Sequence, residues 1–357
     1  MSLQTLIENE LDPYLIEIDE GTHYPKQFIQ TLFKEGYFKE NDLKNNLEII
    51  EEVSKSCLTT GFCLWCQLAF STYLENADQA HLNHDLQQSL LNGDILGATG
   101  LSNPMKSFND LESFNLSHHY QEGKFYVNGR LPAVSNIGSD HYFGAISKSE
   151  TDDELVMFIV HANQDGIILD EKSNFLGVNG SATFAITMDD VLIPDTQIIT
   201  HDAKSFASDI RPKFVTLQVP IALGSVRASL DLIHKFSDAQ NGINKYLEYD
   251  ISDFESRYKQ IKQDFYNLVA KNDLDNQFGE LIRLKKEAGY LLLEVNQASM
   301  VNGGSRAYSP KAPQARKLKE GFFFAALTPT LRHLGKLEEE FKSFNYCLLY
   351  TSDAADE

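Results

Sequence analysis

Asn128-Gly129-Arg130-Leu131-Pro132-Ala133-Val134-Ser135-Asn136 is the stretch that decides the fold of this chain. Asn-Gly is the strongest short signal for a β-hairpin, because a type I′ turn needs positive φ at both central residues. Strand-forming side chains flank the pair on both sides, namely Phe125, Val127, Leu131 and Val134. The stretch therefore predicts β-structure with a hairpin turn at Asn128-Gly129.

A second stretch with the same character runs from Gly177 to Pro194 and contains Gly-Val-Asn-Gly-Ser-Ala-Thr and Met-Asp-Asp-Val-Leu-Ile-Pro. Apolar runs at Leu155 to Val160 and Phe184 to Met188 lie between turn residues, as strands do. The sequence on both sides instead has apolar residues at helical spacing, over Pro25 to Gly36, Leu43 to Val53, Gly61 to Leu74, Phe214 to Leu232, Phe254 to Leu268 and Leu281 to Val295. The chain thus predicts helices, then a small all-β unit, then helices.

Four motifs in this order resemble those of the acyl-CoA dehydrogenases, a flavoprotein family whose flavin lies between a central β domain and a C-terminal helical bundle. The motifs are Leu101-Ser102-Asn103-Pro104, Asn128 to Asn136, Gly177 to Pro194, and Gly303-Gly304 with Arg316 to Glu320. The resemblance covers roughly Pro25 to Leu334. It implies an α+β fold that is mostly α, with an N-terminal helical domain, a central small β-barrel and a C-terminal four-helix bundle.

The expected domain limits are 1–95 for the N-terminal helices, 96–200 for the β domain and 201–346 for the bundle. Residues 347–357 can be back-translated to a nucleotide string that resembles the transposon end and adapter used in DNA library preparation. We therefore expect this tail to be non-native. An ordinary acidic tail is the alternative.

Composition sets limits on partners and location. The 357 residues carry a formal net charge of −20, which argues against nucleic acid or an anionic membrane as a partner. The first 20 residues lack the apolar segment of an export signal, and no apolar run reaches a membrane-spanning length. With only four cysteines, this predicts a reduced cytoplasmic protein. The Cys63 to Cys66 C-x-x-C lies inside an apolar helix, so we expect core packing rather than a redox or metal site.

The resemblance implies FAD as the cofactor, with FMN as the alternative. The implied flavin contacts are Leu101, Ser102, Val134, Ser135, Gly303 and Gly304. Ala133 stands where the family has a flavin-stacking Trp, and the single tryptophan, Trp65, lies elsewhere in the sequence. Ser237 to Gly242 lacks the family's R-x-x-F-G, which reaches the flavin diphosphate of the partner subunit.

The proton-abstracting carboxylate of the family has no counterpart, because no Asp or Glu occurs between Gly321 and Leu337. The family's position for this acid falls on Thr328, or on Ala325 in another alignment, and its alternative position falls on Phe214. Asp209, just upstream, is the candidate base; the alternative is that it N-caps the helix. His141 and His333 are further site candidates, with surface histidines as the alternative.

Three functions stay open. The first is α,β-dehydrogenation of an acyl thioester, with hydride passing to flavin N5; the second is a monooxygenase-like reaction of reduced flavin; the third is a non-catalytic flavin-fold scaffold. The resemblance implies acyl-CoA or a similar small molecule as substrate, an electron-acceptor flavoprotein as a further partner, and a homo-oligomer (dimer or tetramer). From the net charge and the residue spacings, we expect no nucleic-acid, membrane or metal partner.

Overall fold

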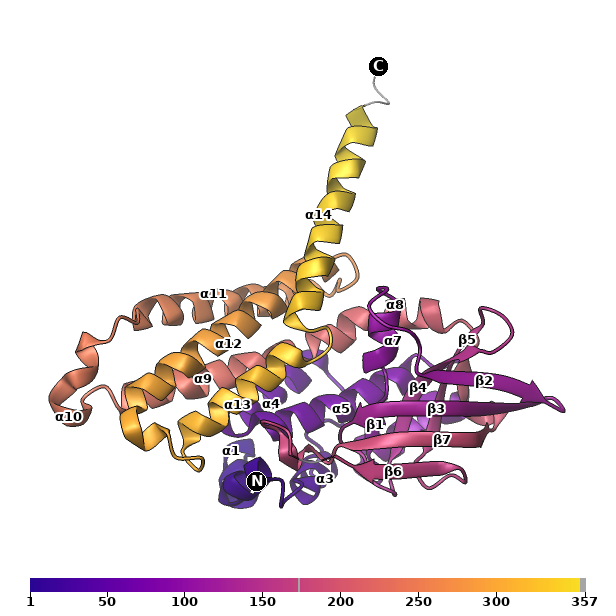
Figure 1. Cartoon of the computed structure of the whole chain (residues 1–357), viewed down its shortest axis with the longest axis horizontal. Helices are drawn as coiled ribbons and strands as arrows, with labels where there is room; N and C mark the ends of the chain where they lie inside the picture. The colour runs from indigo at the N-terminus through magenta and orange to yellow at the C-terminus, as the bar shows by residue number, and fades with distance from the viewer. Residues whose placement is uncertain (173, 354–357) are drawn as a thin grey trace.

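The computed structural model describes residues 1–172 and 174–353, with side chains up to residue 342. Its first part is helical (Figure 1): α1 (Leu3–Glu10), α2 (Leu15–Glu20), α3 (Lys26–Lys34), α4 (Leu43–Ser56), α5 (Leu58–Glu75), a π-helical turn (His81–Leu86) and α6 (Gln87–Leu91). Helices α3, α4 and α5 confirm the three helices predicted for this part, whereas α1 and α2 were not predicted. Helix α5 is buried on nearly every side, as its lack of polar residues predicted. It runs through the middle of the molecule and contacts β1, α8 and α9.

The central part is one eight-stranded sheet: β1 (Gly97–Thr99), β2 (Leu116–Gln121), β3 (Lys124–Val134), β4 (Tyr142–Ser149), β5 (Leu155–His161), β6 (Ile167–Glu171), β7 (Phe184–Ile193) and β8 (Ile198–Thr200). The strand order is β6-β7-β3-β2-β4-β5-β8, with β1 paired to β4. The short helix α7 (Ser102–Ser107) follows β1. Residues from almost every strand form an apolar core of their own, separate from the larger helical core. The sheet therefore encloses its own interior while one end of it meets the helices.

The predicted hairpin turn at Asn128-Gly129 is wrong. Strand β3 runs straight through this pair, and the register with β7 shifts between Val127 and Gly129, which has φ +129°. The shift is a β-bulge in β7, where Asp189 and Asp190 lie opposite the single residue Asn128 and Asp190 has φ +46°. The Asn128 amide donates to an Asp190 carboxylate oxygen at 2.7 Å, and its carbonyl oxygen accepts from the Asp190 backbone N–H at 2.8 Å. The β2–β3 hairpin turns instead at Glu122 and Gly123, both with positive φ.

The last part is helical: α8 (Ala203–Thr216), α9 (Val219–Lys235), α10 (Ala239–Gly242), α11 (Ile251–Ala270), α12 (Phe278–Ala307), α13 (Pro313–Ala326) and α14 (Leu331–Asp353). Helix α12 packs against α9, α11 and α13, which forms the bundle (Figure 1). The predicted helix from Phe214 to Leu232 is in fact two helices, and Pro220 starts the second rather than kinking one. Asp250 caps α11 by accepting the Asp253 backbone N–H.

Helix α14 projects away from the bundle toward its C-terminal end (Figure 1). The backbone of residues 347–353 belongs to this helix, while residues 354–357 lie outside the described residues. The expectation of a non-native tail therefore stays a prediction. Within the part of the chain that the structure describes, no helix combines the length and the apolarity needed to cross a membrane.

Candidate functional site

Two adjoining cavities lie where the sheet meets the bundle. The outer cavity has a volume of about 320 Å³ and is lined by Ala133, Ser135, Phe175, Leu176, Gly177, Val178, Ser181, Thr183, Lys319, Phe322, Phe323 and Ala326. The inner cavity, about 190 Å³, is lined by Phe62, Trp65, Cys66, Thr99, Ser102, Ala133, Ser135, Phe214, Phe323, Ala326, Leu327 and Thr328. Four residues line both, so the two form one site. Its walls come from α5, from β3, from the segment around Phe175 to Thr183 and from α13.

The end of β3 and the start of α7 place the predicted flavin contacts at this site. Ser135 lines both cavities, and Ser102, the first residue of α7, lines the inner one. The Ser102 hydroxyl oxygen lies 2.9 Å from that of Thr328. Leu101 and Val134 are buried beside them. The structure thus brings four of the six predicted contacts to one place.

Hydroxyl groups form a connected row along the outer cavity. The Thr183 hydroxyl lies 2.7 Å from that of Ser135 and 2.8 Å from that of Ser181. Ser181 also donates to the Val178 carbonyl oxygen at 2.8 Å. Most of the remaining wall is apolar, and the one charged side chain among its described lining residues, Lys319, is paired with Asp19. The cavity therefore offers an apolar surface with a hydrogen-bonding edge.

The segment after α13 is held from behind by buried polar groups. The Lys285 ammonium is completely buried and donates to the carbonyl oxygens of Leu327 at 3.1 Å and Pro329 at 2.7 Å. Burial lowers the pKa of Lys285 well below its usual value. The Gln218 amide donates to the Thr328 carbonyl oxygen at 2.9 Å. These contacts fix the Thr328 side chain where it lines the inner cavity.

The prediction that Asp209 is the base finds no support in its position. Phe214 lines the inner cavity, as predicted, but Asp209 is five residues earlier and therefore about 140° around α8. Asp209 is exposed. The alternative that it caps α8 is wrong as well, because Asp202 is the cap and accepts the Ser205 backbone N–H. Among the residues that the structure describes, no carboxylate lines either cavity.

Gly303 and Gly304 lie outside both cavities. They belong to the last turns of α12, where Gly304 leaves helical geometry with φ +59° and is exposed. The structure does not bring them to the other four predicted flavin contacts. Their implied role therefore stays a prediction.

The alternative of surface positions for His141 and His333 is wrong, since both side chains are buried. His141 Nδ1 lies 2.9 Å from the Asn136 carbonyl oxygen, and burial lowers its pKa. Burial lowers the pKa of His333 to about 4. Neither histidine lines the site. In the described ranges, no group of three or more His, Cys, Asp or Glu side chains is arranged to hold a metal ion.

Trp65 is a site residue that the sequence did not reveal. Its indole lines the inner cavity, and its Nε1–H donates to the Phe214 carbonyl oxygen at 3.0 Å. Cys66 lines the same cavity, and burial raises the pKa of its thiol well above the usual range. Cys63 is buried with a raised thiol pKa as well. These values agree with the prediction that the C-x-x-C is core packing.

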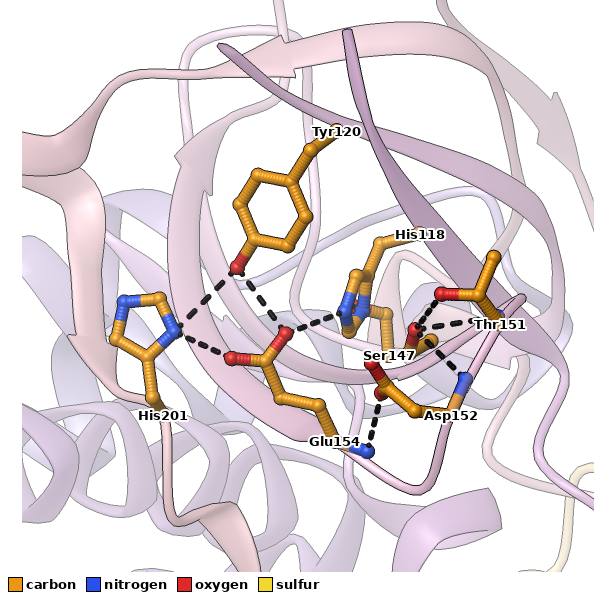
Figure 2. Close-up of polar contacts among 8 residues, drawn as sticks. His118, Tyr120, Ser147, Thr151, Asp152, Glu154 and His201 are labelled. Atoms are coloured by element: carbon orange, nitrogen blue, oxygen red, sulfur yellow. Dashed lines mark hydrogen bonds and ion pairs between the residues drawn. The ribbon is translucent and has the colours of Figure 1, made fainter. Parts of the chain in front are cut away.

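Figure 2 shows a second polar cluster on the sheet, and none of its labelled residues lines either cavity. Glu154 accepts hydrogen bonds from His118 Nε2 at 3.2 Å, from the Tyr120 hydroxyl at 3.1 Å and from His201 Nδ1 at 2.9 Å. His118 Nδ1 lies 2.9 Å from the Ser147 hydroxyl oxygen. A serine, a histidine and a carboxylate in a row suggest a hydrolase triad, but Ser147 is completely buried and cannot reach a substrate. The cluster instead ties β2, β4 and β5 to the segment that enters α8.

Comparisons with known proteins give relatives at low sequence identity, most of them named acyl-CoA dehydrogenases. No protein-family model matches the chain. The chain is 25% identical over 217 residues to the short-chain specific acyl-CoA dehydrogenase of Clostridium acetobutylicum, an alignment that spans 56% of each protein, so the chain matches about half the length of that relative. It is 22% identical over 328 residues to the 3-(aryl)acrylate reductase of Clostridium sporogenes, which covers 83% of this chain and 85% of that protein.

The fold agrees with these matches. The butyryl-CoA dehydrogenase of Megasphaera elsdenii superposes with a TM-score of 0.85 at 18% identity, over 95% of both chains. This shared architecture confirms the predicted order of helices, β domain and bundle. Together with the sequence relatives, it supports the predicted resemblance to the acyl-CoA dehydrogenase family.

Proposed function

We propose that the chain is a flavin-dependent oxidoreductase of the acyl-CoA dehydrogenase type, acting on an acyl thioester. The observation that carries the proposal is the two-part site between sheet and bundle, because Ser102 and Ser135 both line its inner cavity. Of the three positions on which the family's acid can fall, Thr328 and Phe214 line the inner part and Ala325 does not. Relatives named acyl-CoA dehydrogenase and 3-(aryl)acrylate reductase support the same chemical class.

The residues of the site fit a flavin ring system, which is flat, has two apolar faces and carries polar atoms along its edge. Phe323 and Leu176 supply apolar wall, and the small side chain of Ala133 leaves the face beside it open. The Ser102 and Ser135 hydroxyls and the Thr183 hydroxyl would hold the polar edge. FAD is the proposed form. When bound, the flavin would accept the hydride that leaves the β-carbon of the acyl group.

The chain's own contribution is to exclude water and to position the thioester. The inner cavity is walled by buried aromatic side chains, and the Ser102–Thr328 hydroxyl pair is its hydrogen-bonding element on the α13 side. A hydroxyl with an ordinary pKa cannot remove an α-proton efficiently at neutral pH. Proton removal from an unactivated acyl group is therefore expected to be slow in this protein.

The missing carboxylate favours a second candidate, a monooxygenase-like reaction in which reduced flavin uses oxygen. Such a reaction does not depend on a carboxylate base that removes an α-proton. We propose, in either case, a homo-oligomer. For the dehydrogenase we also propose an electron-acceptor flavoprotein as partner.

The test begins with the absorbance spectrum of the purified protein after incubation with FAD. Bound flavin supports either enzyme, whereas a protein that binds no flavin at all fits only the scaffold. Anaerobic addition of acyl-CoA thioesters then separates the two enzymes, because a dehydrogenase bleaches the oxidised flavin. A monooxygenase-like enzyme leaves the flavin oxidised under these conditions. It consumes oxygen once the flavin has been reduced and substrate is present.

A further inference from the structure

The inner cavity has an unusual concentration of aromatic side chains. Phe62, Trp65, Phe214 and Phe323 contribute to its wall, and they also contact one another. The Trp65 ring lies 4.8 Å from Phe214 in an edge-to-face arrangement and 5.7 Å from Phe62 in a stacked one. Phe62 in turn meets Phe323 edge-to-face at 4.6 Å. The four rings form a continuous aromatic wall.

This wall is held in place and presents little polarity. The only polar group of the indole, Nε1–H, is used by the Phe214 carbonyl oxygen, so the rest of the Trp65 ring is available as apolar surface. Phe62, Trp65 and Phe214 are each at most 5% exposed. Rings packed against one another in this way lose little further freedom when a ligand arrives.

Charge is absent from the inner cavity. In the described part of the chain, none of its lining residues is acidic, basic or a histidine. The hydroxyls there already have partners, since Ser102 pairs with Thr328 and Thr99 with Tyr73. A carboxylate or ammonium group at the far end of a ligand would therefore be buried without a counter-charge.

Size limits the occupant further. The cavity measures about 190 Å³, and a dry apolar protein cavity of about 150 Å³ is enough to bind benzene. One aromatic ring on a short linker therefore fits. A straight chain of similar carbon number has the room only if it folds, and it forms no edge-to-face contacts with the four rings.

We infer that the inner cavity is an acyl pocket that selects an uncharged aromatic acyl group over a straight-chain acyl group of similar size. The assignment of the ligand as a thioester rests on the proposed function. The preference itself rests on the aromatic wall, the missing charge and the volume. A 3-phenylpropanoyl thioester is the representative ligand of this class.

Trp65 provides the assay, because it is the only tryptophan of the chain and lines the cavity. The full-length protein is titrated with 3-phenylpropanoyl-CoA and with octanoyl-CoA, and indole emission is followed with excitation at the red edge of the band. We expect both to change the emission, with the aromatic thioester binding roughly tenfold more tightly, the scale of one to two aromatic pair contacts. Equal affinities, or tighter octanoyl binding, would overturn the inference.

Single-residue variants test whether the aromatic wall causes the preference for the aromatic thioester. Phe214→Leu and Phe62→Leu each remove one ring while keeping an apolar side chain, and each should bring the two affinities to within about twofold to threefold. Tyr290→Leu, on an exposed position of α12, is the matched control and should keep the full preference. If the preference survives both phenylalanine changes in folded protein, the aromatic wall is not its origin. The second variant covers the case in which the first fails to fold.

The experiments distinguish failure of the proposed function from failure of this inference. A protein that binds no FAD but still prefers the aromatic thioester keeps the inference and loses the proposed activity. A flavin-containing protein without the preference does the reverse. Binding detected by calorimetry with no change in Trp65 emission would place the ligand elsewhere and also overturn the inference.

Discussion

Thr328→Glu should create the base that the site lacks. Thr328 is one of the positions on which the family's acid falls; it lines the inner cavity and is only 5% exposed. A carboxylate there would be buried with no cation among the described residues that line the cavity, so desolvation should raise its pKa above the usual value of about 4.3, with the buried Lys285 behind the segment opposing part of the rise. The Ser102 hydroxyl, 2.9 Å from the present Thr328 oxygen, is placed to donate a hydrogen bond to it.

A positioned base of suitable pKa contributes about 10²- to 10⁴-fold to a proton transfer. We therefore expect Thr328→Glu, loaded with FAD, to bleach at least 100-fold faster than the unmodified protein with 3-phenylpropanoyl-CoA under anaerobic conditions. The rate should rise with pH through the raised pKa of the new carboxylate. Thr328→Gln has the same size but no base and serves as control. Equal rates in the Glu and Gln variants, with flavin bound in both, would refute the reasoning.

The polar cluster of Figure 2 gives two further predictions. Glu154→Ala leaves the buried His118 N–H without its acceptor and should lower the free energy of unfolding, measured by urea denaturation, by about 1–3 kcal/mol. Asp153→Ala, at the exposed neighbouring position, is the control and should change the free energy of unfolding by less than about 0.5 kcal/mol. Similar losses in both variants would contradict a stabilising role for the Glu154 cluster. Burial lowers the folded-state pKa of His118 below 6.5. The contribution of neutral His118 to the free energy of unfolding is therefore complete above pH 6.5 and is lost as pH falls through the folded-state pKa. His118→Phe should flatten that part of the stability–pH curve. Finally, Cys63 and Cys66 should react slowly with mild thiol reagents in the folded protein, because both are buried with raised pKa; rapid modification of both would show that they are accessible.

Local sequence patterns predicted those helices and strands whose tertiary packing agrees with the local preference. The apolar stretch from Gly61 to Leu74 could be recognised as a buried helix because it contains no charged side chain and few polar ones. The Asn128-Gly129 turn could not be corrected from local sequence. Its side-chain partner is Asp190, 62 positions away, and that contact together with the β7 pairing favours the bulge over the turn.

The site was predictable only where a family motif marks it. Ser102, Ser135, Phe214 and Thr328 were identified through the resemblance, and the fold brings them together. Trp65 carries no such mark, because its hydrogen-bond partner is Phe214, 149 positions later in the chain. A residue's part in a cavity wall depends on such tertiary contacts, which no local pattern records.

The helical phase explains the failure of the remaining candidate. Proximity in sequence made Asp209 attractive, since it lies near Phe214. On a helix, however, five positions turn a side chain by about 140°, so one of the two faces solvent when the other faces the site. Counting the helical phase from Phe214 would have excluded it from sequence alone.

The central claim is that the site between sheet and bundle holds a flavin, and FAD titration of protein stripped of cofactor tests it most directly. Trp65 emission follows the titration, with Ala133→Arg, which fills both cavities with a long cation, as the blocked variant. We predict saturation at one FAD per chain with quenching of Trp65, and no binding by the blocked variant, while Asp153→Ala binds normally. If the unmodified protein binds no FAD, or if Ala133→Arg binds it equally well, the flavin does not occupy this site.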